Sequence, residues 1–259
     1  PWADNPYRPK WAGWSDRRLE KSVVAAADRL IFTSPQIRQL VMAKYPADWL
    51  AKAHVLPHAF DGSRQTQQTR DGPFLLRHLG NFYNQRSPAP LIGALRILSH
   101  RHSDLKRELQ VDLVGTMGAA TGAGFDLSGL PEGLLKVLPA VDYQVSLDMM
   151  AASDLLVVID AAAKTNVFLP SKLVDYVGAG RPIFAISPPG ASADLVGALG
   201  GQSAAPNDPA AIADGLAGFI AAGRWPHDRA WGEPSVRRKY DAETVAAAFD
   251  AIVHEVMTS

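Results

Sequence analysis

The segment DLLVVIDAAAKTNVFLPSKLVDYVGAGRPIFAI, residues 154–186, decides the fold. Two short apolar runs, at 154–160 and 181–187, flank a pattern at 171–180 whose apolar residues recur with helical spacing. The runs are continuous rather than alternating, which is typical of strands buried on both faces. The Gly-Arg-Pro sequence at 180–182 separates the helix from the second run. This segment therefore predicts two parallel strands joined by a crossover helix.

The same alternation continues on both sides of this segment. Strand-like runs are FLLRHLG, LQVDLVG and LLKVLPAV, and helical patterns are PLIGALRILSHRH, QVSLDMMAAS, SADLVGAL and DPAAIADGLAGFIAAG. Short apolar strands that alternate with helices indicate a parallel sheet covered on both faces. We predict a doubly wound, Rossmann-like α/β domain over residues 73–225.

The remaining parts of the chain fit a second, incomplete unit. Residues 1–60 contain only two strand-like runs, too few for a stable sheet, so we expect them to be the end of a domain whose earlier strands are absent. Residues 61–72, DGSRQTQQTRDG, are polar and unperiodic, which is typical of a linker. The sequence pattern of residues 226–259 predicts terminal helices beyond the sheet.

Composition excludes several classes of protein. The 259 residues carry a formal net charge of zero, which argues against nucleic-acid binding through bulk charge. The absence of cysteine excludes disulfides and thiolate metal sites and favours a reducing compartment. No apolar stretch approaches the ~20 residues of a membrane span, so we expect a cytoplasmic protein. No H-E-x-x-H or D-x-D sequence is present, and we therefore expect neither a metal nor another cofactor.

Small, polar or charged residues follow the predicted strands, where an open α/β sheet binds its ligands. Gly80 and Asn81 follow one strand, and Arg86 precedes the next helix. A glycine allows a ligand to approach the backbone, and an arginine can hold phosphate oxygens. Asp160 follows another strand, but its position is also that of a residue that only caps a loop.

The first turn of the helix at 171–180 adds an anion site. Ser171 opens the helix, where backbone N–H groups and the helix dipole favour anions. Lys172 and Asp175 are three residues apart and lie on one side of the helix. The lysine can bind a second phosphate oxygen, and the carboxylate can accept hydrogen bonds from the two hydroxyls of a ribose. Together these residues predict a site for a nucleotide diphosphate.

Several segments resemble the donor-binding half of the retaining glycosyltransferases of family four, which have the two-domain B-type fold. They are GNFYNQRSPAPLIGAL, VDLVG, MMAASDLLVVID and FLPSKLVDYVGAGRPIFAI. ADRLIFTSPQIRQL and AHVLPHAFD are similar to the end of the acceptor-binding half of that family. The resemblance implies that residues 1–60 are the end of the acceptor-binding domain, 61–72 the hinge, and 226–259 helices that cross back toward the first segment.

The resemblance also implies roles for individual residues. Arg86 would hold the diphosphate, with Lys172 and the backbone of Ser171 and Leu173 assisting, and Asp175 would bind the ribose. Arg86 and Lys172 would then be catalytic, because they stabilise the departing diphosphate. This chain has Asp175 where most members have glutamate. The earlier glutamate of the family falls on Val167, and we consider Asn166 as its replacement.

From these observations we expect metal-independent, retaining transfer from a nucleotide-diphosphate sugar to a glycan or lipid-linked acceptor, in the synthesis of bacterial surface or exported polysaccharide. The alternative is a non-catalytic nucleotide-sugar-binding module, or a donor-half fragment without transfer activity. Peripheral membrane association through the missing N-terminal domain would place the protein at the inner face of the membrane. A nicotinamide-dependent enzyme is disfavoured, because GTMGAATGAG lacks the G-x-G-x-x-G spacing.

Overall fold

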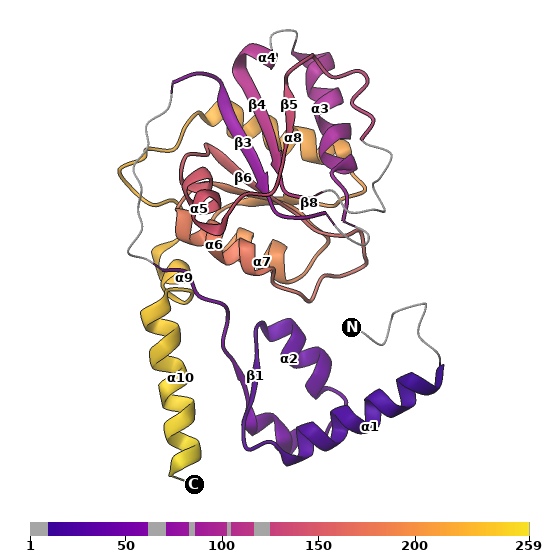
Figure 1. The fold of residues 1–259 in the computed structure, drawn as a ribbon, viewed down its shortest axis with the longest axis vertical. Helices are drawn as coiled ribbons and strands as arrows, with labels where there is room; N and C mark the ends of the chain where they lie inside the picture. Colours follow the sequence, from indigo (N-terminus) through magenta and orange to yellow (C-terminus); the bar gives the residue numbers. More distant parts are fainter. Residues whose placement is uncertain (1–9, 62–70, 83–85, 103–104, 117–124, 259) are drawn as a thin grey trace.

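The computed structural model describes residues 10–61, 71–82, 86–102, 105–116 and 125–258. Within these residues the main sheet has six strands, all parallel, in the order β5-β4-β3-β6-β7-β8 (Figure 1). The strands are β3 (Phe74–Leu79), β4 (Leu109–Val114), β5 (Leu135–Leu138), β6 (Leu155–Ile159), β7 (Ile183–Ile186) and β8 (Gln202–Ala204). The prediction of a doubly wound parallel α/β sheet is confirmed.

The strand order reverses between β3 and β6. From β3 the chain moves outward through β4 to β5, then returns to pair β6 with the other edge of β3 and moves outward through β7 to β8. Such a reversal leaves a crevice at the carboxyl ends of the two central strands, because the following loops diverge to opposite sides.

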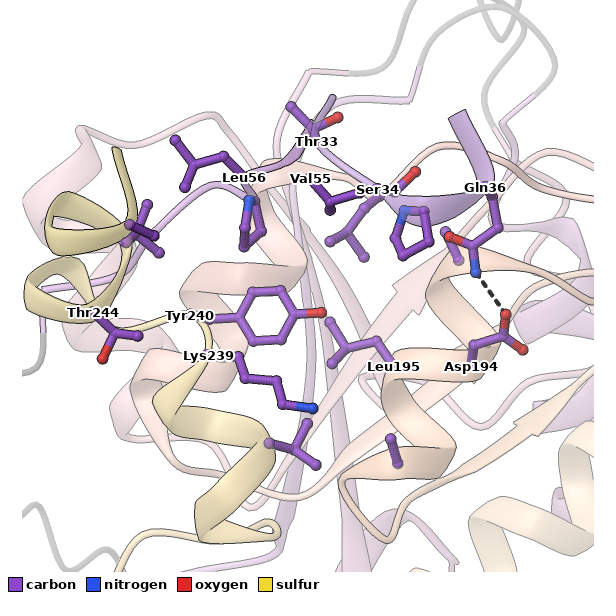
Figure 2. Close-up of a pocket in the computed structure, with 18 residues that line it drawn as sticks. Thr33, Ser34, Gln36, Val55, Leu56, Asp194, Leu195, Lys239, Tyr240 and Thr244 are labelled. Carbon is purple, nitrogen blue, oxygen red and sulfur yellow. Dashed lines mark hydrogen bonds between the residues drawn. The ribbon is translucent and has the colours of Figure 1, made fainter. Parts of the chain in front are cut away.

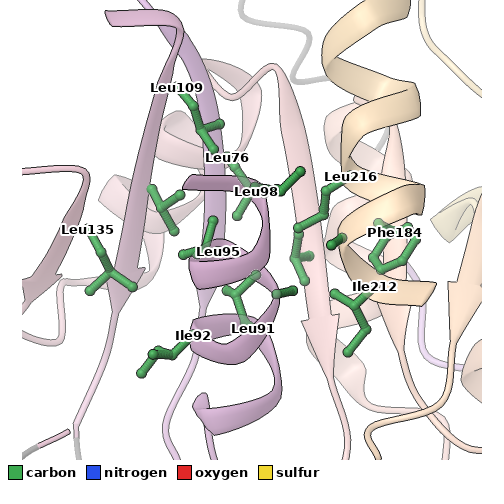
Figure 3. Close-up of a cluster of buried hydrophobic side chains, with 14 of the residues drawn as sticks. Leu76, Leu91, Ile92, Leu95, Leu98, Leu109, Leu135, Phe184, Ile212 and Leu216 are labelled. Carbon is green, nitrogen blue, oxygen red and sulfur yellow. The ribbon is translucent and has the colours of Figure 1, made fainter. Parts of the chain in front are cut away.

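Two helical layers cover the sheet. The helices are α3 (Ala89–Arg101), α4 (Leu105–Glu108), α5 (Tyr143–Ala151), α6 (Ser171–Ala179), α7 (Ala191–Ala198) and α8 (Pro209–Ala222). Leucines and isoleucines of α3 and α8 pack on one face of the sheet (Figure 3). α5, α6 and α7 pack on the other face. Alternate residues of β6 serve the two layers, since successive strand side chains point to opposite faces: Val157 joins the first cluster and Val158 the second.

The first segment forms a small separate layer. It contains α1 (Lys10–Ala26), β1 (Leu30–Phe32), α2 (Pro35–Met42), a 3₁₀ helix (η2, Ala47–Lys52) and β2 (Ala53–Val55). β1 and β2 pair in parallel and form a two-stranded sheet among the described residues. Ser34 starts α2, because its side-chain oxygen accepts a hydrogen bond from the Ile37 amide, as is typical of an N-cap.

The C-terminal helices α9 (Pro234–Arg238) and α10 (Ala242–Met257) connect the two parts. α10 extends from the main domain alongside the first segment (Figure 1). Phe60 and Asp241 form a parallel β-bridge, and Arg29 pairs with Glu255 at 3.3 Å. Among the described residues, no helix has the length and apolar character needed to cross a membrane.

Three short elements were not predicted from the sequence. β8 is a partly exposed three-residue edge strand of polar and small residues, so it lacks the apolar run that marks the other strands. η2 and α4 are too short to show a periodic pattern. Most of the predicted linker at 61–72, and much of the glycine-rich loop at 115–124, lie outside the described residues.

Candidate active site

The candidate site lies where β3 and β4 end. Gly80 and Gly115 follow these strands with φ angles of 136° and 144°, a region that side chains disfavour. A Cβ on Gly115 would lie 2.4 Å from the carbonyl oxygen of Gly80, so the two turns can approach each other only because both residues are glycines. Next to them is a cavity of about 300 Å³, whose lining also includes Ala140, Val141, Tyr143, Lys172 and Asp175.

Asp175 projects from α6 at one side of this cavity. Its Oδ1 accepts a 2.9 Å hydrogen bond from the hydroxyl of Tyr143, the first residue of α5. Burial raises the pKa of Asp175, although the bond from Tyr143 opposes that shift. The contact holds the carboxylate in one orientation. The sequence did not single out Tyr143 as a ligand-binding side chain, because nothing local links it to a residue 32 positions later.

Lys172 reaches across from α6 to the end of β3. A Cβ on Gly80 would lie 2.9 Å from its Nζ and 3.0 Å from its Cδ, so the lysine passes through the space that the missing side chain leaves. Burial, reinforced by the nearby Arg86 guanidinium, lowers the pKa of Lys172 to about 7, and Asp160 opposes this shift. The protein surroundings therefore stabilise the ammonium form only weakly.

The partner of Lys172 is His78, a fully buried residue of β3. Its Nε2 lies 3.1 Å from Lys172 Nζ, and its Nδ1 lies 2.8 Å from the carbonyl oxygen of Val157 on β6. The imidazole also stacks on Phe82, with ring centroids 4.7 Å apart. Burial, followed by the Lys172 charge, holds the pKa of His78 well below its usual value. The imidazole is therefore neutral.

Arg86 is joined to the carboxyl end of β6. Its Nη2 lies 3.5 Å from Oδ1 of Asp160, whose side chain is almost completely buried. The other carboxylate oxygen, Oδ2, accepts hydrogen bonds from Asn166 Nδ2 at 2.8 Å and from Ser187 Oγ at 3.0 Å. This network connects the ends of β6 and β7 with the guanidinium group of Arg86. It also gives Asn166 a role in fixing Asp160.

The structure brings the predicted site residues together, except that Leu173 is buried in the core. Gly80, Asn81, Lys172 and Asp175 line the cavity, and Arg86 lies beside them through Asp160. Asn81 accepts a hydrogen bond from the amide of Thr116 at 2.8 Å, so its side chain joins the ends of β3 and β4. Ser171 is exposed at the start of α6.

Leu173 is the exception. Its side chain is fully buried in the second core cluster, and its amide already donates a 3.0 Å hydrogen bond to the carbonyl of Pro170. The tight first turn of α6 thus already engages the Leu173 amide, and its binding to phosphate stays a prediction. The site residues that sequence reasoning missed are His78 and Tyr143. A histidine in a mostly apolar strand was the available signal for the first.

A second cavity, of about 500 Å³, lies between the first segment, α7 and the C-terminal helices. Figure 2 shows Lys239 and Tyr240 beside Leu195, and the 2.7 Å hydrogen bond from Gln36 Nε2 to Asp194 Oδ2 across its edge. None of the sequence-predicted site residues lines this cavity. Across the described part of the chain, no group of three or more histidine and acidic side chains gathers as a metal site.

The fold is similar to those of several solved glycosyltransferases. The lipopolysaccharide outer core galactosyltransferase WaaB superposes with a TM-score of 0.65 at 16% identity, over 88% of this chain and 62% of WaaB. HepE of Anabaena, solved with UDP, superposes with a TM-score of 0.72 at 15% identity, over 98% of this chain and 70% of HepE. The trehalose 6-phosphate synthase of Burkholderia multivorans superposes with a TM-score of 0.66 at 13% identity, over 93% of this chain and 62% of that enzyme.

These similarities establish the fold, the Rossmann-like B-type glycosyltransferase fold predicted from the sequence. The chain spans 62% of the length of WaaB, so it corresponds to part of that protein. No protein-family model matches the sequence. A search of curated proteins finds no match either.

Proposed function

We propose that this chain is the donor-binding half of a retaining glycosyltransferase of family four and binds a nucleotide-diphosphate sugar beside Gly80. One observation carries the proposal: Lys172 lies against the Gly80 turn, with the Arg86 guanidinium close enough to act on its charge, and Asp175 lines the same cavity. A dianionic diphosphate next to a ribose complements such a set of groups. The shared fold with the UDP-bound HepE supports the same placement.

The three parts of the nucleotide have different surroundings in this proposal. The diphosphate lies over Gly80, where Lys172 and Arg86 reach it. The ribose hydroxyls donate hydrogen bonds to Asp175, which Tyr143 orients from the opposite side. The base lies along the loop at 139–143, whose Ala140 and Val141 form an apolar wall of the cavity.

The chemistry follows from the charge that develops in the reaction. The bond between the sugar's anomeric carbon and the terminal phosphate oxygen breaks, and the nucleotide diphosphate leaves with additional negative charge. The acceptor hydroxyl forms the new bond to that carbon, and its proton passes to the departing phosphate oxygen. Lys172 and Arg86 would stabilise the leaving diphosphate, the kind of preorganised electrostatic assistance that lowers such barriers. Because two protein cations supply this charge, we propose a metal-independent reaction. Retention of the anomeric configuration is proposed from the resemblance to family four.

We further propose that the acceptor is a glycan or a lipid-linked sugar in the synthesis of surface or exported polysaccharide. The relatives in fold include a lipopolysaccharide outer core galactosyltransferase, which supports this class of acceptor. Such acceptors are available in the cytoplasm, or at the inner face of the membrane for an enzyme that associates with it peripherally.

A second candidate function is nucleotide-sugar binding without transfer. The described part of the first segment contributes a sheet of only two strands, β1 and β2. In B-type enzymes the acceptor lies on the domain opposite the donor, and positioning of the two reactants accounts for several kcal/mol of the barrier. If this two-stranded segment does not position an acceptor, the chain would bind the donor and release its sugar slowly.

Incubation with a panel of UDP-, GDP- and dTDP-sugars tests both candidates. We expect ¹H NMR to show release of nucleotide diphosphate from one donor, with the first-formed sugar or glycoside keeping the anomeric configuration of that donor, and with no loss of rate in EDTA. Binding without any release would favour the binding module. An inverted product would contradict the retaining assignment, and loss of turnover in EDTA would contradict metal independence.

A further inference from the structure

His78 is an unusual residue for its position. It lies in β3 between Arg77 and Leu79, is fully buried, and contacts no solvent. Burial of a polar ring is costly unless its nitrogens are hydrogen-bonded, and both nitrogens of His78 have partners. One partner is the backbone of the neighbouring strand, but the other is Lys172, a side chain that the proposed function places at the diphosphate. The second contact therefore joins the buried ring to a side chain of the proposed site.

The hydrogen bonds determine the tautomer of the ring. A backbone carbonyl can only accept, so the 2.8 Å contact with Val157 requires the hydrogen on Nδ1. In a neutral imidazole the other nitrogen is then an acceptor. Nε2 therefore accepts a hydrogen bond from Lys172 Nζ at 3.1 Å. Stacking against Phe82 fixes the plane of the ring and hence the direction in which Nε2 points.

Gly80 determines where the ammonium group can go. Because a Cβ on Gly80 would lie 2.9 Å from Nζ, the lysine end is held directly beneath the turn that lines the cavity. An ammonium group has three N–H donors, and the bond to His78 uses one of them. The other two remain for further acceptors. His78 thus holds the lysine from the protein interior, at the place where a phosphate would bind from the cavity.

We propose that His78 is a positioning residue of the phosphate site: its neutral Nε2 holds Lys172 beneath Gly80, so that the ammonium group meets the diphosphate of the nucleotide without searching other rotamers. The inference rests on the proposed function, since it assigns Lys172 to the diphosphate. Ordering a long side chain before binding reduces the entropy lost on binding. It also requires that His78 stay neutral, because a protonated ring would present a donor to the ammonium and repel it.

The position of Lys172 makes diphosphate binding depend on pH. The charged and titratable groups around it are His78 and Arg86 on the β3 side, Asp160 at the end of β6, and Asp175 one turn along its own helix. The pKa of Lys172 is about 7. Above that pH, binding of a nucleotide to the ammonium form therefore requires the uptake of a proton by the lysine. Affinity should therefore fall as pH rises from about 7 toward 9, a range in which the terminal phosphate, with a second pKa of about 6, stays ionised.

The test compares three variants in calorimetric titrations. His78→Leu removes both hydrogen bonds while keeping similar volume, and His78→Gln keeps an acceptor for Lys172. His100→Leu is a matched control, because His100 is exposed at the end of α3. The probes are UDP, GDP and dTDP, with the tightest carried forward together with its own nucleoside. Each titration is repeated from pH 7 to 9.

We expect His78→Leu to bind the nucleoside diphosphate about tenfold more weakly and the nucleoside within about twofold of the original protein. His78→Gln should recover most of the loss, and His100→Leu should change neither affinity. His78→Leu should also move the fall in affinity to lower pH, because loss of an acceptor disfavours the ammonium form. A structural role alone would weaken nucleoside and diphosphate equally and leave the pH profile in place.

Three outcomes would overturn the inference. One is an unchanged diphosphate affinity in a folded His78→Leu variant, and another is equal losses for nucleoside and diphosphate. The third applies even if that variant does not fold: ¹⁵N NMR of the original protein must show a neutral ring with hydrogen on Nδ1, and a protonated Nε2 excludes the proposed contact. If the original protein binds none of the three diphosphates, the proposed function fails first. If it binds one and His78→Leu binds it equally, only the positioning role fails.

Discussion

Tyr143 and Asp175 both line the cavity beside Gly80 and are in direct contact, with the tyrosine hydroxyl 2.9 Å from the aspartate Oδ1. The first residue of α5 thereby orients a carboxylate in the first half of α6. One oxygen of the carboxylate is engaged by the protein, and the carboxylate as a whole still has capacity to accept further hydrogen bonds. A ribose has two adjacent hydroxyls that can use it.

Asp175→Asn should weaken nucleoside and nucleoside diphosphate alike, by about tenfold each, because both ligands carry the ribose and the charged acceptor is lost. Tyr143→Phe should have a smaller effect, since it removes only the contact that orients the carboxylate. Calorimetric titration measures both. Normal binding of both ligands by Asp175→Asn would remove Asp175 from the ribose site.

Arg86→Ala should lower the affinity for the nucleoside diphosphate and not for the nucleoside. The lost contact is to phosphate, so affinity for the diphosphate should fall about ten- to a hundredfold, while affinity for the nucleoside stays the same. Arg96→Ala is the control, because Arg96 lies on the outer side of α3 and pairs with Asp126 at 2.8 Å. Equal weakening of both ligands by Arg86→Ala would show that Arg86 acts through folding, through its contact with Asp160.

Lys172→Met should weaken diphosphate binding and stabilise the folded protein. In the folded protein the pKa of Lys172 is about 7, below its ordinary value of 10.5, so between these values the unfolded chain binds more protons and the free energy of unfolding rises with pH. Lys172 therefore destabilises the fold most at or below neutral pH. The methionine variant should melt at a higher temperature at pH 7, by about 2–4 °C for each kcal/mol gained, and should lose diphosphate affinity.

Thermal melts at pH 7 and pH 9.5 measure this effect, since the difference between the two proteins should shrink at the higher pH. A methionine variant that melts lower at pH 7 would mean that the lysine stabilises the empty site. The low pKa would then have to be abandoned.

Gly80→Ala should damage the site through sterics. The new Cβ would lie 2.9 Å from Lys172 Nζ, at a φ of 136° that alanine disfavours, so the lysine must leave its position beside His78. We expect both diphosphate affinity and melting temperature to fall. Gly218→Ala is the matched control, because its Cβ meets no atom within 4 Å and alanine stabilises a helix interior by about 0.5–1 kcal/mol. Unchanged diphosphate binding by Gly80→Ala would separate this turn from the site.

The sequence predicted what is encoded locally. β6 and β7 are continuous apolar runs, and Gly180 in the left-handed conformation ends α6 where the Gly-Arg-Pro sequence indicated. β8 could not be predicted in this way, because a polar edge strand of three residues is defined by pairing with β7 and not by its own pattern.

In the site, too, the sequence predicted what is encoded locally and missed what depends on distant contacts. Lys172 and Asp175 were predicted because their helical spacing places them on one side of α6. The contact of Lys172 with His78 joins residues 94 positions apart and depends on the order of β3 and β6 in the sheet, which periodicity does not specify. The paired amide of Leu173 was missed for a different reason, because the tightness of a first helical turn is a backbone detail that residue identity does not determine.

The most direct test of the central claim is calorimetric titration of the 259-residue chain with UDP, GDP and dTDP, each alongside its nucleoside. We predict that at least one diphosphate binds with a dissociation constant below about 1 mM, and more tightly than its nucleoside by the contribution of Lys172 and Arg86. Failure of all three to bind at millimolar concentration would contradict the assignment of this cavity to a nucleotide-diphosphate sugar.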